Sequence, residues 1–220
     1  MSRTASLSHH PREDLLWDHY RGALAPGLAL TVSAHLDVCA RCREELRVFD
    51  AVGGALLDEI EGVAMSEDAL DLAMARIERP QEPEAPAPRH PRFLKGLDLP
   101  PSLRSARIAG RYWAAPGVWM APIRLDGTDP KDKTYLMSVS KGMVMPEHSH
   151  RGHEVTMVLK GRFSDAAGEY GPGDFVLCDQ RICHSPVMAN DEDCVCLVWQ
   201  DALIVPKTWL GKLLQPLARI

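Results

Sequence analysis

The sequence predicts a multidomain α + β protein: a small all-α helical bundle, a Pro-rich linker and an all-β domain of the sandwich or barrel kind. Three observations support this. Apolar residues recur at helical spacing before residue 79, prolines stand at almost every second position of 79–92, and short β-type runs follow. The 220 residues suffice for two modest domains, each with its own core. We expect a helical domain over 1–79, a linker over 80–100 and a β-domain over 101–220.

The helical domain should contain three or four short helices. Leucine and alanine at helical spacing predict helices over 14–24 and over 28–42, the latter continuing towards residue 56 with Gly53-Gly54 as a candidate interruption. Pro26-Gly27 separates the two runs. Ser66 is the expected N-cap of a last helix, which would place Leu70, Met74 and Ile77 on one face.

The β-domain is predicted from alternating turn signals and apolar runs. Gly, Pro, Asn and Asp recur between short segments rich in Val, Ile, Tyr, Phe and Leu. The clearest such segments are 135–139, 155–159, 175–177 and 195–199. Strands of this length and spacing are typical of an all-β sandwich or barrel. A closing helix is expected over 209–217.

Composition excludes several classes of protein. No apolar run approaches the ~20 residues of a membrane span, and the N-terminus lacks the apolar stretch of a secretory signal, so we expect a cytoplasmic protein without a membrane partner. Residues 1–80 hold 8 Lys and Arg against 14 Asp and Glu. Because phosphates attract cations, this acidic half argues against direct nucleic-acid binding and favours a basic protein partner. In a reducing compartment the six cysteines are thiols or metal ligands.

The first metal-type motif is His35-x3-Cys39-x2-Cys42. On one continuous helix these side chains fall within an arc of roughly 60°. Thiolate and imidazole suit tetrahedral Zn²⁺, which needs a fourth ligand. The candidates for this ligand are His10, His9, His19 and, less favoured, Asp37. Two small buried thiols, or a transient Cys39–Cys42 disulfide, are the alternatives.

The second motif lies in the β-domain and reads Gly142-x5-His148-x-His150-x3-Glu154-x6-Gly161. Residues two apart on a strand face the same side, so His148 and His150 should point together into the domain. Glu154 keeps the same parity, and His184 follows a later strand as a fourth candidate ligand. Imidazole and carboxylate ligands do not by themselves distinguish zinc from iron, manganese or nickel.

The first motif resembles the zinc anti-sigma domain, with His10, His35, Cys39 and Cys42 as the matching residues. The resemblance covers roughly residues 1–79. It implies a small helical bundle with a Zn²⁺ site. It also implies a bundle that binds an extracytoplasmic-function sigma factor and occludes the surface that engages RNA polymerase core.

The second motif resembles the cupin family, whose second conserved motif is represented here by Pro172-Gly173-Asp174 and His184. Met188 stands where that motif usually has Asn. The resemblance implies a cupin (jelly-roll) barrel in which His148, His150, Glu154 and His184 hold a divalent metal. Zn²⁺ is the expected ion, with Fe²⁺ and Mn²⁺ as alternatives.

Over nearly its whole length the chain resembles the ChrR-type anti-sigma factors, which join these two domains through a proline-rich linker. The resemblance implies a non-enzymatic regulator of transcription initiation that holds a sigma factor in a 1:1 complex. Oxidants such as singlet oxygen or other reactive oxygen species would release the partner. Cys183, beside His184, and the alternating pair Cys194 and Cys196 are the candidate redox residues.

Two other functions fit parts of the pattern. A cupin-type metal-dependent dioxygenase could use the second metal site while the helices only dimerise the protein. Arg151 and Tyr135 are then the nearest candidate polar partners of a substrate. Alternatively, Cys39 and Cys42 alone could form a redox switch in the helical domain.

Overall fold

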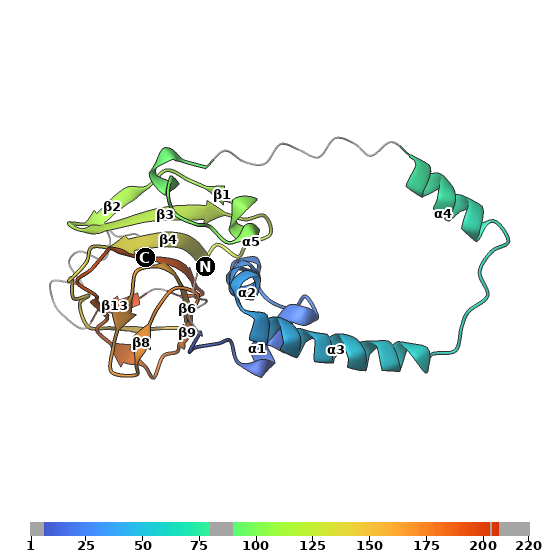
Figure 1. Ribbon diagram of the computed structural model, residues 1–220, viewed down its shortest axis with the longest axis horizontal. Helices are drawn as coiled ribbons and strands as arrows, with labels where there is room; N and C mark the ends of the chain where they lie inside the picture. Colours follow the sequence, from blue (N-terminus) through green and yellow to red (C-terminus); the bar gives the residue numbers. More distant parts are fainter. Residues whose placement is uncertain (1–6, 80–89, 203, 207–220) are drawn as a thin grey trace, which may run out of the picture.

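The computed structural model describes residues 7–79, 90–202 and 204–206 (Figure 1). Its helices are α1 (Glu13–Tyr20), α2 (Pro26–Val38), α3 (Ala40–Asp58), α4 (Ala69–Glu78), the 3₁₀ helix η1 (Arg92–Leu94) and α5 (Pro101–Arg104). The predicted closing helix over 209–217 lies outside the described residues, as do residues 80–89 of the predicted linker.

The helix boundaries differ from the prediction at several places. Helix α1 ends at Tyr20 rather than at residue 24, and Pro26-Gly27 forms the start of α2. The run expected over 28–42 ends at Val38 because Cys39 is extended, with φ −106° and ψ 102°, and α3 begins directly after it. The Sγ of Cys39 accepts a hydrogen bond from the backbone N–H of Cys42, so Cys39 serves as the N-cap of α3. The interruption expected at Gly53-Gly54 is wrong, since α3 runs through both glycines. The N-cap of α4 is Asp68 rather than Ser66.

The β-domain begins with β1 (Arg107–Ile108), β2 (Tyr112–Ala115), β3 (Val118–Arg124), β4 (Lys133–Val139), β5 (His148–His150), β6 (Glu154–Lys160) and β7 (Phe163–Ser164). It continues with β8 (Glu169–Tyr170), β9 (Phe175–Cys178), β10 (Cys183–His184), β11 (Val187–Met188), β12 (Cys194–Gln200) and β13 (Ile204–Pro206). One sheet has the order β1-β3-β4-β12-β6-β9, with β2 also paired to β3. Two three-stranded sheets, β10-β5-β13 and β11-β7-β8, complete the domain, and every pairing is antiparallel. The predicted strands within 135–139, 155–159, 175–177 and 195–199 are all present.

Strand β12 lies at the centre of the large sheet, and both of its faces are covered. All seven of its residues are buried, which explains why its sequence is almost continuously apolar. Cys194, Cys196 and Val198 belong to the inner core of the β-domain, whereas Leu197 and Trp199 pack on the outer side. Only the thickness of β12 itself therefore separates the inner core from the elements that pack on the outer face.

Helices cover that outer face. Figure 1 shows α1 and α2 beside the sheet, with α3 extending away from it and α4 standing apart. Helix α2 contacts β4, β6, β12 and α5. Its approach is close: a Cβ at Gly27 would meet Thr134 Oγ1 at 2.0 Å and Trp199 Cδ1 at 2.5 Å. Glycine is therefore required where α2 meets the sheet.

The helices and the sheet share their core. Leu16 and Val32 of the helices cluster with Val155, Phe175 and Trp199 of the sheet. The sequence predicts a separate core for each domain, and this is wrong for α1 and α2, because the apolar faces of these short helices are completed by the sheet. Leu94 and Leu99, which fall within the predicted linker, are also buried against the sheet. The domain boundaries themselves stay a prediction.

Candidate metal centres

The first cluster forms where three elements of the helical region meet. His10 precedes α1, His35 lies in the last turn of α2, and Cys39 and Cys42 occupy the junction of α2 with α3. One potential ligand atom from each of the four residues lies within 4.8 Å of all the others. The sequence predicts that His35, Cys39 and Cys42 share one face of a continuous helix. The helix instead breaks at Cys39, and the three residues still come together with His10.

Distances within this cluster match a tetrahedral ion. The Nδ1 of His10 lies 3.3 Å from Cys39 Sγ and 3.5 Å from Cys42 Sγ. Zinc bonds of about 2.3 Å to sulfur and 2.0 Å to nitrogen at a tetrahedral angle give S···N edges of roughly 3.5 Å. The Nδ1 of His35 bonds the carbonyl oxygen of Gly173 at 2.8 Å, which leaves its buried Nε2 without a hydrogen-bond partner. An outer hydrogen bond of this kind is what orients a metal-binding imidazole.

Burial makes this cluster unfavourable for charged ligands unless a cation is present. It lowers the pKa of His35 to about 4 and raises the pKa of the Cys42 thiol to about 12. His35 is therefore neutral, as a ligand must be, and the Cys42 thiol ionises when a cation compensates its charge. Two sulfurs and two imidazoles are a donor set that suits Zn²⁺.

The other candidates for the fourth ligand have different partners. The backbone N–H of His9 bonds Asp174 Oδ1, and the His9 ring stacks on Tyr170 at a centroid distance of 4.5 Å. Asp37 Oδ2 accepts the backbone N–H of Ser102 at 2.7 Å. His19 lies on α1 and is not part of the cluster. The geometry favours His10, and the identity of the ligands stays a prediction.

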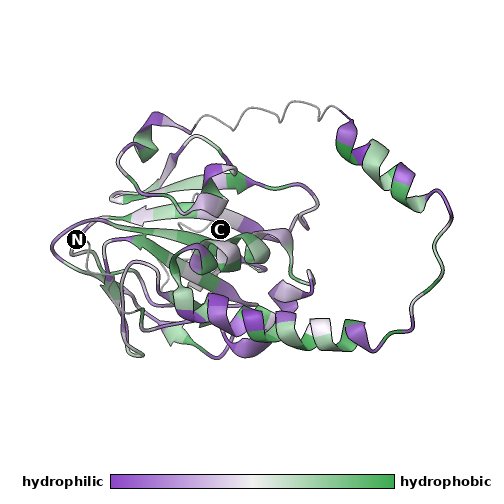
Figure 2. Ribbon diagram, turned by 45° about the vertical axis from the view of Figure 1, so that its right-hand side comes forward, coloured by the Kyte–Doolittle hydropathy of each residue, from purple (hydrophilic) through white to green (hydrophobic). Residues whose placement is uncertain are grey.

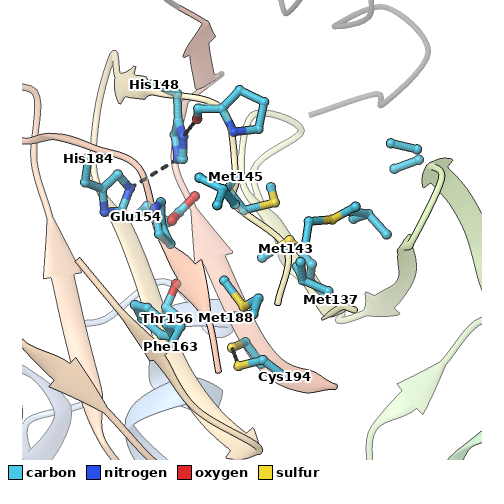
Figure 3. Close-up of a pocket in the computed structure, with 18 of the residues that line it drawn as sticks. Met137, Met143, Met145, His148, Glu154, Thr156, Phe163, His184, Met188 and Cys194 are labelled. Atoms are coloured by element: carbon cyan, nitrogen blue, oxygen red, sulfur yellow. Dashed lines mark hydrogen bonds between the residues drawn. The ribbon is translucent and has the colours of Figure 1, made fainter. Parts of the chain in front are cut away.

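The second cluster joins three strands at one end of the β-domain. His148 and His150 lie on β5, Glu154 begins β6, and His184 on β10 is paired in register with His148. The Nε2 of His184 lies 3.1 Å from that of His148 and 3.4 Å from that of His150, and the Nδ1 of His150 lies 3.8 Å from Glu154 Oε2. Figure 3 shows His148, His184 and Glu154 converging above the interior of the domain. The structure thus brings together all four predicted residues of this site.

Outer hydrogen bonds prepare two of these histidines to bind a metal. The Nδ1 of His148 donates to the carbonyl oxygen of Pro146 at 2.8 Å, and the Nδ1 of His184 lies 3.2 Å from Asp165 Oδ2. Both rings therefore present Nε2 to the cluster. Burial raises the pKa of Glu154 to about 7 and lowers that of His150 to about 4, so a cation is needed to hold the carboxylate in its charged form. The set fits a divalent metal without selecting one.

The predicted redox cysteines lie in two different environments. Cys183 is exposed and donates to Glu147 Oε1 at 3.2 Å, away from the histidines, because alternation on β10 turns it outward while His184 points inward. Cys194 and Cys196 are buried with their sulfurs 3.7 Å apart. The thiol nearest the cluster is Cys178, whose Sγ lies 3.9 Å from His184 Nδ1. It sits opposite Glu154 in the β6–β9 register, a pairing that the sequence does not reveal.

A cavity of about 350 Å³ opens directly beneath the second cluster. His148, Glu154 and His184 form one end of it. The rest of its wall is mostly apolar and rich in sulfur, with Met120, Met137, Met143, Met145, Met188, Cys178, Cys194 and Cys196 (Figure 3). This volume is in the range of small-molecule sites. Neither this cavity nor a second one of about 220 Å³ is lined by a residue of the first cluster.

Tyr135 and Arg151, the polar residues considered for a substrate, are placed differently. Tyr135 lines the cavity, but its hydroxyl is buried and donates to Gln200 Oε1 at 3.0 Å. Arg151 is exposed and does not line the cavity. His153, next to Glu154, is also turned away and bonds Asp201 Oδ2 at 3.0 Å.

Comparison with known proteins agrees with this two-part architecture. A family model described as a ChrR cupin-like domain matches residues 108–204, and one described as a putative zinc finger matches residues 13–43. The latter contains His35, Cys39 and Cys42 but begins after His10. The β-domain is therefore cupin-like, as the sequence predicts, and the helical region carries a zinc-finger signature.

One curated relative and one solved structure match over most of their length. The anti-sigma-E factor ChrR of Cereibacter sphaeroides is 34% identical over 219 residues, 98% of this chain and 100% of that protein. A crystal structure of Rhodobacter sphaeroides SigE in complex with the anti-sigma ChrR contains a chain with a TM-score of 0.70 and 32% identity. That alignment covers 89% of this chain and 100% of the other. Within the described part of the chain, the helices are all too short or too polar to cross a membrane.

Proposed function

The chain belongs to the family of the anti-sigma-E factor ChrR, and we propose that it is an anti-sigma factor, not an enzyme. It acts in the cytoplasm, where it binds an extracytoplasmic-function sigma factor in a 1:1 complex and keeps that factor from RNA polymerase core. Oxidation of the cupin-like domain releases the partner and so allows transcription to initiate. Neither nucleic acid nor membrane takes part in this binding.

The observation that carries this proposal is an uncovered apolar surface on the helices. Val48, Val52 and Leu56 form a stripe at i, i+4 and i+8 on α3, and Leu70, Met74 and Ile77 form one at i, i+4 and i+7 on α4. All six are exposed, with fractions from 46% for Met74 to 74% for Ile77. Figure 2 shows apolar residues among polar ones along both helices. We call these six residues the apolar helix face.

Helix α4 in particular requires a partner. It has ten residues, and none of them is buried. Isolated helices shorter than about 12–15 residues are marginal in water, so packing against another surface must supply most of the stability of α4. A soluble monomer rarely leaves such an apolar stripe uncovered unless it is an interaction site.

Charge indicates the kind of partner. From residue 40 to 79 the chain carries five Arg and ten Asp or Glu, so the segment that contains the apolar helix face has a net negative charge. A protein that itself binds DNA presents basic surfaces, and opposite charge around an apolar contact speeds association and favours the correct partner. A sigma factor has this chemistry, and the relatives support its choice.

The first cluster provides the rigid base for this surface. With Zn²⁺ bound, His10, His35, Cys39 and Cys42 would fix the angle between α2 and α3 and anchor the segment before α1. Zinc at a closed four-ligand site stabilises a fold and supplies no open coordination position. The role of the ion here is therefore structural: it holds α3 in the orientation in which the helix contacts the partner.

A direct route connects this base to the cupin-like domain. His35 bonds the carbonyl of Gly173, and the carboxylate of Asp174 accepts the backbone N–H groups of Ser8 and His9 at 2.8 and 3.0 Å. These residues lead directly into β9, whose last residue, Cys178, lies opposite Glu154. A shift of β9 caused by chemistry at the second cluster thus reaches His35 and the segment that carries His10.

The proposal is tested by replacing residues of the apolar helix face with charge. Val52→Glu and Ile77→Glu should each weaken binding of an extracytoplasmic-function sigma factor from the same genome by about 100-fold, as expected at the centre of an interface. Trp113→Glu is the matched control, since Trp113 is equally exposed but lies on β2. Binding can be measured by isothermal titration calorimetry on the purified full chain.

Unchanged affinity in both helix variants would contradict the proposed surface. If the wild-type chain binds none of the sigma factors, the anti-sigma function fails. Iron in the purified protein together with substrate-dependent O₂ uptake would then favour the dioxygenase alternative.

A further inference from the structure

The feature with no role so far is the set of methionines around the cavity of the cupin-like domain. Five of the nine methionines of the chain line it: Met120, Met137, Met143, Met145 and Met188. They come from β3, β4, β11 and the segment that precedes β5, so three strands and a loop contribute methionine side chains to the wall of one cavity. Figure 3 shows Met137, Met143, Met145 and Met188 around it. We call these four residues the methionine cluster.

Packing alone does not account for the cluster. Methionine is a flexible filler of irregular gaps in cores, but here a volume of about 350 Å³ stays open between the side chains. Met137, Met143 and Met145 are only partly buried. The sulfurs therefore line a space that a small apolar molecule can enter.

The chemistry of thioethers differs from that of the neighbouring thiols. A thiol must lose its proton to become nucleophilic, whereas a thioether has no proton to lose and takes up an oxygen atom directly to form a sulfoxide. An uncharged, apolar oxidant will partition into this apolar cavity in preference to water. Singlet dioxygen is an oxidant of that class.

We propose that the methionine cluster is an oxidation site for singlet dioxygen, and this rests on the oxidant-dependent release proposed above. One O₂ adds to the sulfur of one methionine, and its outer oxygen passes to the sulfur of a second. The O–O bond breaks and two S=O bonds form. Each sulfur gives up two electrons and the O₂ accepts four, so the step needs no proton and no further reductant. A pair of adjacent thioethers is the arrangement that this balance requires.

Oxidation of the methionine cluster reaches the helices through the large sheet. Met137 is paired in register with Met120 and with Cys196, so it lies at the middle of the inner face. The next residue, Leu136, faces outward and packs in the same cluster as Ala34 of α2. A sulfoxide is polar and larger than a thioether, and in this wall it has to draw in water or move the strands. Strand movement here disturbs the surface on which α2 rests.

The test uses the full chain in complex with its sigma factor, illuminated with a photosensitiser. The variant M137L/M143L/M145L/M188L keeps volume and hydrophobicity and removes four of the five thioethers that line the cavity. The matched control M65L/M157L removes one exposed methionine and one buried methionine that does not line the cavity. Sulfoxides are mapped by peptide mass spectrometry, and release is followed by size-exclusion chromatography. If the fourfold variant does not fold, M143L/M145L replaces it, since both side chains are partly exposed.

In the wild type we expect oxygen to be added in pairs within the methionine cluster, at the same rate as release. The fourfold variant should release its partner at least about fivefold more slowly, and the control at the wild-type rate. Release of the wild-type partner with the cluster unmodified, or equal release from the fourfold variant, would overturn the proposal. If no sigma complex forms at all, the proposed function fails. The sulfoxide map of the free chain still tests the proposed oxidation site, because oxidation confined to the exposed Met65 and Met74 would overturn the proposal for the methionine cluster.

Discussion

The two clusters hold four ligand-type residues each, but they differ in their surroundings. The first is enclosed by α1, α2, α3 and the Gly173 turn, and the distances between its donor atoms fit a closed tetrahedral ion. The second forms one end of a 350 Å³ cavity. A closed site can only support a fold, whereas a site beside a cavity is exposed to small molecules. We therefore propose that the helical cluster serves binding of the partner and that the cupin cluster serves its release.

The largest effect is expected from the helical cluster. Replacing both thiolates in Cys39→Ser/Cys42→Ser removes zinc and leaves α2 and α3 without their common anchor. We expect the chain to lose more than about 3 kcal/mol of unfolding free energy and all measurable sigma binding, because structural zinc contributes folding energy directly. Zinc content, thermal unfolding and co-purification test this. The exposed Cys183→Ser is the matched control and should behave as the wild type.

The cupin cluster should behave in the opposite way. In His148→Ala/Glu154→Ala the chain should bind one metal ion per molecule rather than the two that we propose, while sigma affinity changes by less than about twofold, since the apolar helix face is untouched. Metal content by mass spectrometry and affinity by calorimetry measure this. His153→Ala should change neither, because His153 pairs with Asp201 outside the cluster. Loss of sigma binding in the double variant would show that the two clusters do not have separate roles.

An intermediate effect is expected where the two regions join. Asp174→Ala removes the acceptor for the backbone N–H groups of Ser8, His9 and Gly171 and should cost about 1–3 kcal/mol. We expect the variant to bind its sigma factor but to release it differently under oxidant, because the link from β9 to the His10 segment is weakened. Unfolding and release assays measure the two effects. Asp179→Ala, which removes an exposed partner of Arg181, is the control; a variant at Asp174 that releases normally contradicts the link.

The smallest effect concerns pH. His19 is half-buried on α1, and burial lowers its pKa below the ordinary value of 6.5. The neutral form is therefore favoured in the fold. Its contribution to stability is complete above the unfolded pKa of about 6.5 and is lost as the pH falls through the folded value. His19→Gln should flatten the decrease in melting temperature between about pH 7 and pH 5. If the melting temperature of the variant decreases with pH as steeply as that of the wild type, other titrating groups cause the decrease.

The sequence could predict both clusters because their information is local. His35, Cys39 and Cys42 lie within eight residues, and His148, His150 and Glu154 within seven. The break of the helix at Cys39 could not be predicted, since no proline or glycine marks it and the thiol itself caps α3. The sequence does not distinguish His9 from His10 as the fourth ligand, because the two are neighbours in sequence and differ only in what each contacts in the fold.

Long-range partners were beyond prediction for the same reason. The bond from His35 to Gly173 joins residues 138 positions apart, and nothing in the helical motif indicates it. Asp165 beside His184, and Cys178 rather than Cys183 near the cluster, depend on strand register. The methionines are spread over three strands and a loop, so their common cavity appears only when the sheets face each other.

The central claim is that one cluster holds the partner and the other controls its release. It is tested most directly by following oxidant-induced release of a labelled sigma factor from the wild-type chain and from His148→Ala/Glu154→Ala, by fluorescence anisotropy. The account predicts that both chains bind the sigma factor and that only the wild type releases it. Release from the double variant at the wild-type rate would contradict the account, because it would show that the cupin cluster does not control release.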